Sequence, residues 1–225
     1  MTDKLTIPDN TKIPDFINFL FRRLKQPLPG RKSHERMAPI LRNKPFRPFT
    51  PKKDSKPAAV LVLLSQHQSD HFNLLLTLRS NHIRHSGQIS FPGGLTELKE
   101  KPEMTALRET SEEVGINPKN IIIVGTLSEL YVSPSDSIIT PVVGYSKVLN
   151  EMHKNSEEVQ EIIIIGLNHL LQEKNLNREI WDLRGKKVEV PFWNINHKIP
   201  LWGATAMITA ELLELYKEFL RNNNN

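Results

Sequence analysis

The chain contains 225 residues, of which 38% are hydrophobic and 24% are charged, and it carries a formal net charge of +5 at pH 7. This length supports one substantial hydrophobic core with room for an appendage, and the absence of cysteine excludes disulfides, a thiolate nucleophile and zinc–thiolate sites. No apolar run approaches the roughly 18 residues of a membrane span, and the polar N-terminus has no signal-peptide core, so we expect a cytoplasmic protein without a membrane partner.

The first 57 residues differ from the rest in charge and in proline content. They hold 14 Lys and Arg against 5 Asp and Glu, and nine of the 16 prolines. We therefore predict two parts, a basic, proline-rich N-terminal arm at 1–57 and a main domain at 58–225. The arm is interpreted either as a solvated segment that wraps the main domain or as a surface that attracts a polyanionic substrate over long range.

Apolar side chains at helical spacing predict one amphipathic helix in the arm, packed against the main domain. These side chains are Ile13, Phe16, Ile17, Leu20, Phe21 and Leu24. The stretch at 26–56 contains chain breakers throughout, so we expect it to be irregular.

In the main domain, β-rich runs separated by turn signals predict six strands. They are expected at 58–65, 72–79, 88–91, 121–127, 138–145 and 162–165. Pro92 is expected to end strand pairing after the third of them. The remaining elements are a short helix at 168–173, a hairpin that joins 178–183 to 187–192 through Arg184 and Gly185, and a terminal helix at 204–221.

One further helix carries the residues that indicate chemistry. Pro102 suits a first helical turn and Gly115 can take the left-handed conformation that ends a helix, so we predict a helix over about 103–114. Three carboxylates then share one face within a single turn, at positions i, i+3 and i+4. They belong to Glu109, Glu112 and Glu113.

These three carboxylates predict a metal site. Like charges at this spacing cost an exposed helix roughly 0.2–0.5 kcal/mol per pair, and a hard divalent cation reverses the sign of that contribution. Mg²⁺ and Mn²⁺ prefer oxygen ligands, and Mg²⁺ typically combines carboxylates with phosphate oxygens of a substrate. Glu100 on the preceding loop and Arg108 on the helix are placed to pair and hold the two together. The alternative interpretation is a solvated acidic face.

The complete spacing from residue 94 to residue 116 is G-x5-E-x7-R-E-U-x-E-E-x-G-U, where U is usually aliphatic. The fixed positions are Gly94, Glu100, Arg108, Glu109, Glu112, Glu113 and Gly115. This pattern resembles the Nudix box, the signature of hydrolases that cut a nucleoside diphosphate linked to another group. Thr110 departs from it, and because that position faces the core, the departure bears on packing more than on chemistry. The resemblance implies an α/β (α+β) Nudix fold, with a mixed β-sheet sandwiched between helices, and Mg²⁺ or Mn²⁺ as cofactor.

Immediately upstream, residues 75–94 read LLTLRSNHIRHSGQISFPGG. This segment resembles the extra motif of the coenzyme A pyrophosphatase branch of Nudix hydrolases, although the spacing between Arg84 and Gly87 is one residue shorter than usual. The resemblance implies a substrate-binding set in which Arg84, together with Arg79, contacts phosphate. The set comprises Arg79, Ser80, Arg84, Gly93 and Gly94.

Two later segments also resemble this branch. Residues 155–159 imply an acidic residue opposite the metal helix, for which Glu158 is the best match, and Trp202 is interpreted as a packing anchor before the last helix. The implied function is hydrolysis of coenzyme A and acyl-CoA at the pyrophosphate by water, which yields 3′,5′-ADP and 4′-phosphopantetheine or its acyl form. The implied catalytic residues are Glu109, Glu112, Glu100, Arg108 and Glu158, with the general base left open between a box carboxylate and Glu158.

Three other functions stay open at this point. The first is a Nudix hydrolase for another nucleoside diphosphate derivative, such as ADP-ribose, a dinucleotide or capped RNA. The second is a non-catalytic Nudix-like ligand-binding module, although such modules commonly lose the box carboxylates that this chain keeps. The third is RNA binding by the arm, but its basic residues lack interleaved aromatics, so we do not expect nucleic acid as a partner. The sequence leaves a homodimer open.

Overall fold

Strand β3 (Lys56–Gln66) runs through the middle of a mixed sheet and supplies side chains to two separate hydrophobic cores. Because successive side chains of a strand point to opposite faces, Leu61 and Leu63 belong to the core on one face, whereas Val62 and Leu64 belong to the core on the other. The computed structural model describes residues 13–66, 71–80, 87–147, 149 and 152–223.

The main sheet combines one parallel pair with antiparallel neighbours. In order across the sheet its strands are β10 (Val159–Gly166), β4 (Phe72–Arg79), β3, β9 (Ser137–Ser146) and β7 (Ile122–Thr126). Strands β3 and β9 are parallel, and the other pairs along this path are antiparallel. Three short strands attach to this path: β5 (Ile89–Ser90) on β4, β6 (Gly93–Leu95) on β3 and β8 (Leu130–Val132) on β9.

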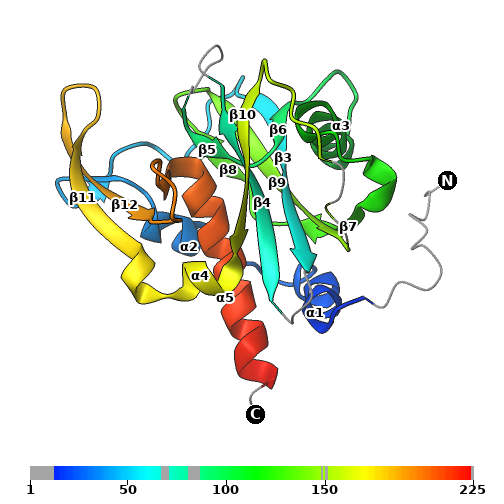
Figure 1. Cartoon of the computed structure of the whole chain (residues 1–225). Helices are drawn as coiled ribbons and strands as arrows, with labels where there is room; N and C mark the ends of the chain where they lie inside the picture. Colours follow the sequence, from blue (N-terminus) through cyan, green and yellow to red (C-terminus); the bar gives the residue numbers. More distant parts are fainter. Residues whose placement is uncertain (1–12, 67–70, 81–86, 148, 150–151, 224–225) are drawn as a thin grey trace.

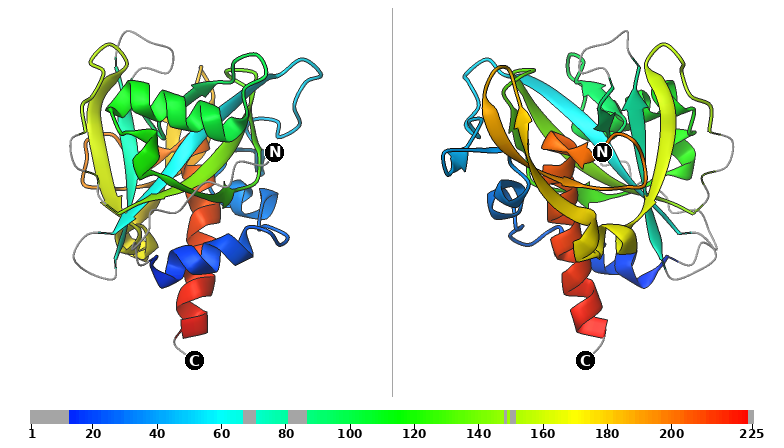
Figure 2. Two further views of the ribbon diagram at one scale, coloured as in Figure 1. Left: turned by 90° about the vertical axis from the view of Figure 1, so that its right-hand side faces the viewer. Right: turned by 60° about the vertical axis from the view of Figure 1, so that its left-hand side comes forward.

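Helices cover both faces of this sheet (Figures 1 and 2). Helix α3 (Pro102–Val114) covers one face and buries Ala106, Leu107 and Val114 in the smaller core. The opposite face is covered by α1 (Asp15–Arg23), α4 (Leu167–Leu171) and α5 (Gly203–Asn223). This layering confirms the expected α/β/α sandwich with the acidic helix and the terminal helix on opposite sides. None of the described helices combines the length and apolarity that crossing a membrane requires.

Helix α1 packs against the main domain through aromatic side chains, as its amphipathic pattern predicts. Phe16 is fully buried, and its ring centroid lies 4.8 Å from that of Tyr216 and 5.1 Å from those of Phe219 and Phe72. Tilted and edge-on pairs of this kind add about 0.5–1.5 kcal/mol each beyond the burial of area. Helix α1 is therefore anchored where the sheet meets the terminal helix.

A second, smaller sheet joins the arm to the predicted hairpin. Its strands are β11 (Leu176–Asp182), β12 (Lys187–Trp193), β1 (Ile40–Leu41), β2 (Lys44–Pro45) and β13 (Leu201–Trp202). Strands β11 and β12 pair antiparallel, and Arg184 and Gly185 take positive φ values of 57° and 74° in the turn between them. The hairpin is confirmed at the expected turn.

The expectation that 26–56 is irregular is wrong in part, because this stretch contains α2 (Arg31–Arg36) and the strands β1 and β2. The helix and the strand pair each depend on partners that are distant in sequence. Ile40 of β1 pairs with Glu189 of β12, and six-residue α2 is too short to be stable alone.

Glu211 of α5 connects α2 to the rest of the molecule. Its carboxylate is fully buried and accepts hydrogen bonds from the backbone N–H of Gly30 at 2.8 Å and from Nε2 of His34 at 3.0 Å. It also accepts from the hydroxyl of Ser128 at 2.7 Å. Burial raises the pKa of Glu211, but the hydrogen bonds from His34, Ser128 and Gly30 outweigh burial, so the net pKa lies below its ordinary value. The buried charge thus fixes the arm against the terminal helix.

Pairing of β5 with β4 ends at Ser90, before Pro92, as expected. A new pairing, of β6 with β3, begins at Gly93, and between the two the Pro92 carbonyl accepts a hydrogen bond from the backbone N–H of Leu61 at 2.8 Å. Pro92 removes only a donor, so its carbonyl remains available to the ladder. The short strands β8 and β13 were not expected, since runs of two or three residues show no periodicity. The division of the chain at residue 57 stays a prediction.

Candidate active site

Helix α3 begins and ends where its capping residues predict. Pro102 is its first residue, and Gly115 follows its last residue with a φ of 71°. A Cβ at Gly115 would also lie 3.1 Å from backbone atoms of His153, so both conformation and packing favour glycine. Thr110 is buried on the core side and donates to the carbonyl of Ala106 at 2.6 Å, which satisfies its hydroxyl within the helix.

Glu100 and Arg108 hold the preceding loop to α3, as the spacing suggested. Nε of Arg108 donates to Glu100 Oε1 at 3.0 Å, and Nη2 donates to Oε2 at 3.1 Å. Glu100 also accepts from Oγ1 of Thr105 at 2.8 Å and from the backbone N–H of Glu97 at 3.1 Å. The bonds from Arg108, followed by those from Thr105 and Glu97, lower the pKa of Glu100 to about 2. Thr105 was missed from the sequence, because its side chain acts on a residue outside the helix.

Arg108 also joins two of the predicted metal ligands. Its Nη1 donates to Glu109 Oε1 at 2.9 Å and to Glu112 Oε2 at 3.1 Å. The Glu112 side chain is 55% exposed, whereas that of Glu109 is 16% exposed. The two carboxylates therefore lie on the same side of the helix at different depths, and one guanidinium bridges them.

The carboxylate of Glu109 lies directly against Gly94. A Cβ built on Gly94 would be 2.4 Å from Glu109 Cδ and Oε1 and 2.6 Å from Oε2. Burial raises the pKa of Glu109, Arg108 opposes that rise, and the charges of Glu112 and Glu158 reinforce it. The absence of a side chain at Gly94 thus creates the space that an acidic group occupies.

Glu113 is the deepest of the three glutamates, at 2% exposed. Its Oε1 lies 3.9 Å from Nη1 of Arg79, and its Oε2 is buried without a hydrogen-bond partner among the described residues. Burial raises the pKa of Glu113 to about 8; Arg79 opposes the rise, and the charges of Glu109 and Glu158 add to it. An unpartnered buried carboxylate oxygen is costly, which makes this atom the strongest single indication that the cluster can bind a cation.

The segment before β10 brings Glu158 toward these glutamates. The backbone N–H of Asn155 donates to the carbonyl of Glu113 at 2.9 Å, and the carbonyl of Glu158 accepts from the backbone N–H of Ser80 at 2.9 Å. The Ser80 hydroxyl donates to the carbonyl of Glu157. In this structure Ser80 therefore connects β4 to the Glu158 segment through both its backbone and its side chain.

These residues fit a hard divalent cation, although they are not assembled as a ligand set. No three His, Asp or Glu side chains within the described ranges are arranged to hold a metal, and Arg108 bridges Glu109 and Glu112 instead. The donors are nevertheless all carboxylate oxygens, which Mg²⁺ and Mn²⁺ prefer. A cation beside Glu113 would satisfy its unpartnered oxygen and favour the charged form of the carboxyl group.

Of the five predicted substrate-binding residues, three are placed beside the glutamates, Ser80 contacts the Glu158 segment, and one cannot be placed. Arg79 and Gly94 contact Glu113 and Glu109 as described, and Gly93 packs on β3, where its Cβ would lie 2.4 Å from the Ala59 carbonyl oxygen. Arg84 lies outside the described residues.

A pocket of about 240 Å³ adjoins this cluster. Arg79, Gly93 and Gly94 line one part of it, and apolar side chains such as Ile89 and Ile139 line much of the rest. A ligand with a charged end and an apolar body would match such a lining.

Known proteins with similar sequences belong to the family that the sequence pattern resembles. A family model described as the NUDIX domain matches residues 55–183. Nudix hydrolase 3 of Caenorhabditis elegans is 32% identical over 161 residues, which cover 64% of this chain and 66% of that protein. The Nudix hydrolase NudL of Yersinia enterocolitica is 30% identical over 224 residues, which cover 95% of this chain and 98% of that protein.

Two further similarities were found. The human mitochondrial coenzyme A diphosphatase NUDT8 is 36% identical over 149 residues, which cover 63% of this chain and 62% of that protein. The crystal structure of RenU, a Nudix hydrolase from M. smegmatis, superposes with a TM-score of 0.50 at 17% identity and covers 73% of this chain and 88% of that one. The similarity to RenU, at this low identity, shows the fold alone.

Proposed function

The chain belongs to the NUDIX family and is a Nudix pyrophosphohydrolase, and on that basis we propose that its substrates are coenzyme A and acyl-CoA. Hydrolysis at the pyrophosphate would release 3′,5′-ADP together with 4′-phosphopantetheine or its acyl form. The relatives whose printed names include this activity support the proposal, namely the human and mouse mitochondrial coenzyme A diphosphatases NUDT8.

The contact between Gly94 and Glu109 carries this proposal. Gly94 is the last residue of the segment at 75–94, which resembles the coenzyme A motif, and it is also the first residue of the Nudix box. Its Cα lies against the carboxylate of Glu109. A ligand bound along that segment would therefore meet the acidic helix, where the pyrophosphate is to be cut.

In this proposal the glutamates of α3 would hold the cation, and the cation would bind the pyrophosphate oxygens. Nudix hydrolases generally use divalent metal ions, and Glu109, Glu112 and Glu113 would hold Mg²⁺ or Mn²⁺ here. The bound cation would neutralise charge on the phosphoryl group and acidify a water molecule. Arg108 orients Glu109 and Glu112 through one guanidinium nitrogen, while its other contacts keep it on Glu100.

Two groups are candidates for accepting the proton of the attacking water. Glu158 approaches from the segment opposite α3 and raises the pKa values of both Glu109 and Glu113 by its charge. Burial already raises the pKa of Glu109, and a carboxylate with a raised pKa is the better base. Arg79, 3.9 Å from Glu113, is placed to contact a phosphate oxygen.

The test is product analysis by mass spectrometry with coenzyme A, Mg²⁺ and ¹⁸O-labelled water. We expect 3′,5′-ADP and 4′-phosphopantetheine, with one ¹⁸O atom in only one of them, which identifies the phosphorus attacked. ADP-ribose, a dinucleotide and capped RNA are measured in parallel at equal concentration. Equal or faster turnover of any of these would overturn the substrate assignment while leaving the Nudix hydrolase assignment intact.

A further inference from the structure

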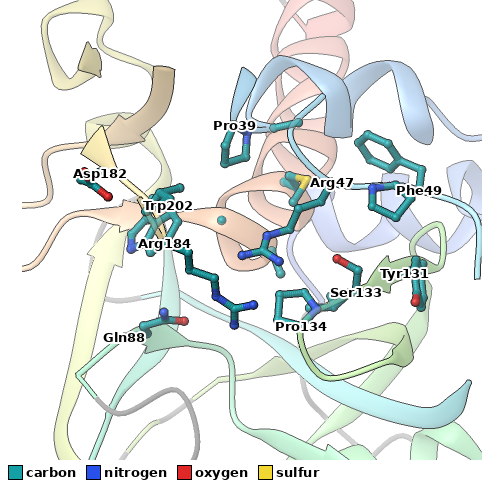
Figure 3. Close-up of a pocket in the computed structure, with 17 residues that line it drawn as sticks. Pro39, Arg47, Phe49, Gln88, Tyr131, Ser133, Pro134, Asp182, Arg184 and Trp202 are labelled. Atoms are coloured by element: carbon teal, nitrogen blue, oxygen red, sulfur yellow. The ribbon is translucent and has the colours of Figure 1, made fainter. Parts of the chain in front are cut away.

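A second pocket, of about 360 Å³, lies between the arm, the hairpin turn and the start of α5 (Figure 3). Two arginines that are far apart in sequence line it, Arg47 from the arm and Arg184 from the turn between β11 and β12. Figure 3 shows both guanidinium groups reaching into the same space, with that of Arg184 between Gln88 and Pro134. The pocket therefore concentrates positive charge from two separate segments.

Nearby acidic groups do not balance this charge. Among the ion pairs of the described residues, neither Arg47 nor Arg184 takes part in one. Asp182 is the single acidic side chain among the lining residues, and it accepts from the backbone N–H of Gly185 at 2.8 Å and lies 3.4 Å from Nζ of Lys187. Burial, followed by the charge of Arg184, lowers the pKa of Arg47, yet a guanidinium stays protonated in proteins.

The start of α5 adds a second source of positive potential. Gly203 and Ala204, its first two residues, line the same pocket. The first N–H groups of a helix have no partner within it, and the aligned peptide dipoles give that end a partial positive charge. The first turn of α5 contains no acidic side chain to offset this charge. Two guanidinium groups and a helix start that face one pocket match an anion with several oxygens.

This pocket adjoins the one beside the acidic helix. Gln88, Val132 and Trp202 line both pockets, together with the start of α5. The pocket beside the helix reaches Gly94, which contacts the Glu109 carboxylate. One extended ligand can therefore lie with its diphosphate at α3 and its far end at the two arginines.

We propose that Arg47 and Arg184 form a subsite for a phosphomonoester carried by the substrate, at a distance from the diphosphate that is cut. This inference rests on the proposed function, in which the substrate bears a 3′-phosphate on its ribose. It gives the arm a direct contact with the ligand, beyond long-range attraction. The class of ligand selected is a nucleoside diphosphate derivative with an additional phosphate group, in preference to the same molecule without it.

The test uses the full-length variants Arg47→Gln and Arg184→Gln, with Arg42→Gln as the matched control. Arg42 lies in the same arm and is exposed, it does not line the pocket, and its substitution removes the same charge. The kinetic measurement is kcat/KM for coenzyme A and for 3′-dephospho-coenzyme A. We expect each pocket variant to lose about 10- to 100-fold on coenzyme A, the range for a hydrogen bond to a charged group, and to change less than about threefold on the dephosphorylated analogue.

Equilibrium binding to the protein without added metal separates failure of this inference from failure of the proposed function. The probes are 3′,5′-ADP, 5′-AMP and inorganic phosphate. Wild type and Arg42→Gln should bind 3′,5′-ADP about tenfold or more tightly than 5′-AMP, and both pocket variants should lose that preference. This outcome would support the subsite even if coenzyme A were not hydrolysed.

Three results would overturn the subsite. The first is an equal loss for phosphorylated and dephosphorylated ligands in the pocket variants. The second is the same loss in Arg42→Gln, which would mean that only net charge matters. The third is arginine-dependent binding of inorganic phosphate without any preference of wild type for 3′,5′-ADP, which would assign the pocket to a free anion.

Discussion

Replacement of Gly94 by alanine should separate activity from stability. The new Cβ would lie 2.4 Å from Oε1 of Glu109, whereas ordinary van der Waals contact begins at 3.4 Å, so the carboxylate must withdraw by about 1 Å. The carboxylate ends a flexible side chain, and a shift away from its preferred rotamer costs about 0.5–1.5 kcal/mol. The fold should therefore survive.

The activity should not survive to the same degree. Metal–ligand distances are held to within about 0.2 Å, and a misplacement of about 1 Å at a reacting centre costs roughly 100-fold in rate. We expect kcat with Mg²⁺ to fall about 100-fold, with a Tm within a few degrees of wild type. The assay is steady-state hydrolysis of coenzyme A, together with thermal unfolding followed by circular dichroism.

Substitutions at two other glycines provide the controls. Gly93→Ala would place a Cβ 2.4 Å from the Ala59 carbonyl oxygen and 2.6 Å from the Val60 Cα, at a φ of 154°, so it should destabilise the protein itself. Gly166→Ala would bring its Cβ only within 3.6 Å of the Asn73 side chain, so neither property should change. Wild-type turnover by Gly94→Ala, at an unchanged Tm, would refute the role given to the position of Glu109.

Three further predictions concern the charge of the site, the buried carboxylate and the arm. Glu112→Gln should remove nearly all hydrolysis while leaving the circular dichroism spectrum unchanged, because it deletes a metal-binding charge with little change of shape; a variant with wild-type turnover, or an unfolded one, contradicts this. Glu211→Gln should lower the free energy of unfolding by about 2–3 kcal/mol at pH 7. Because the folded-state pKa of Glu211 is lowered, its contribution to the free energy of unfolding is fully present above the ordinary pKa of 4.5 and is lost as pH falls through the lower folded-state pKa. Urea unfolding should therefore show the stabilities of the two proteins converging in acid. A constant difference in stability down to pH 2 would count against this. Phe16→Ala should cost about 3–5 kcal/mol in the same measurement, and a loss below about 1 kcal/mol would mean that α1 does not stabilise the domain.

Much of the fold follows from local signals. The helix that bears the glutamates was bounded correctly because Pro102 and Gly115 act on their immediate neighbours. Strand β4 was predicted over its exact range, since a continuous β-rich run bounded by turns specifies a buried strand. The alternation along β3 then determined which face each of its side chains occupies.

The elements that were missed depend on contacts across long stretches of sequence. Helix α2 is held by Glu211, which lies 177 positions beyond His34. A six-residue helix has no periodic pattern long enough to detect, so only the buried carboxylate and its donors reveal it. The same holds for Arg47 and Arg184, because no spacing rule connects the arm to the hairpin turn.

Within the site, spacing identified the right helix face but not the depth of each residue. Positions i, i+3 and i+4 place Glu109, Glu112 and Glu113 close together, yet one is half exposed and another is almost fully buried. The packing of α3 on the sheet decides this difference. Burial raises the pKa of Glu113, and Arg79 of β4 opposes that rise while Glu158, from the segment before β10, adds to it.

Anomalous diffraction from crystals soaked in Mn²⁺ shows whether the glutamates of α3 hold a cation. We expect at least one manganese ion bonded to carboxylate oxygens of Glu109, Glu112 or Glu113, with the unpartnered oxygen of Glu113 engaged by the ion or by its water. A manganese ion bound only elsewhere on the chain, or an empty site with Arg108 still bridging Glu109 and Glu112 at saturating Mn²⁺, would contradict this expectation.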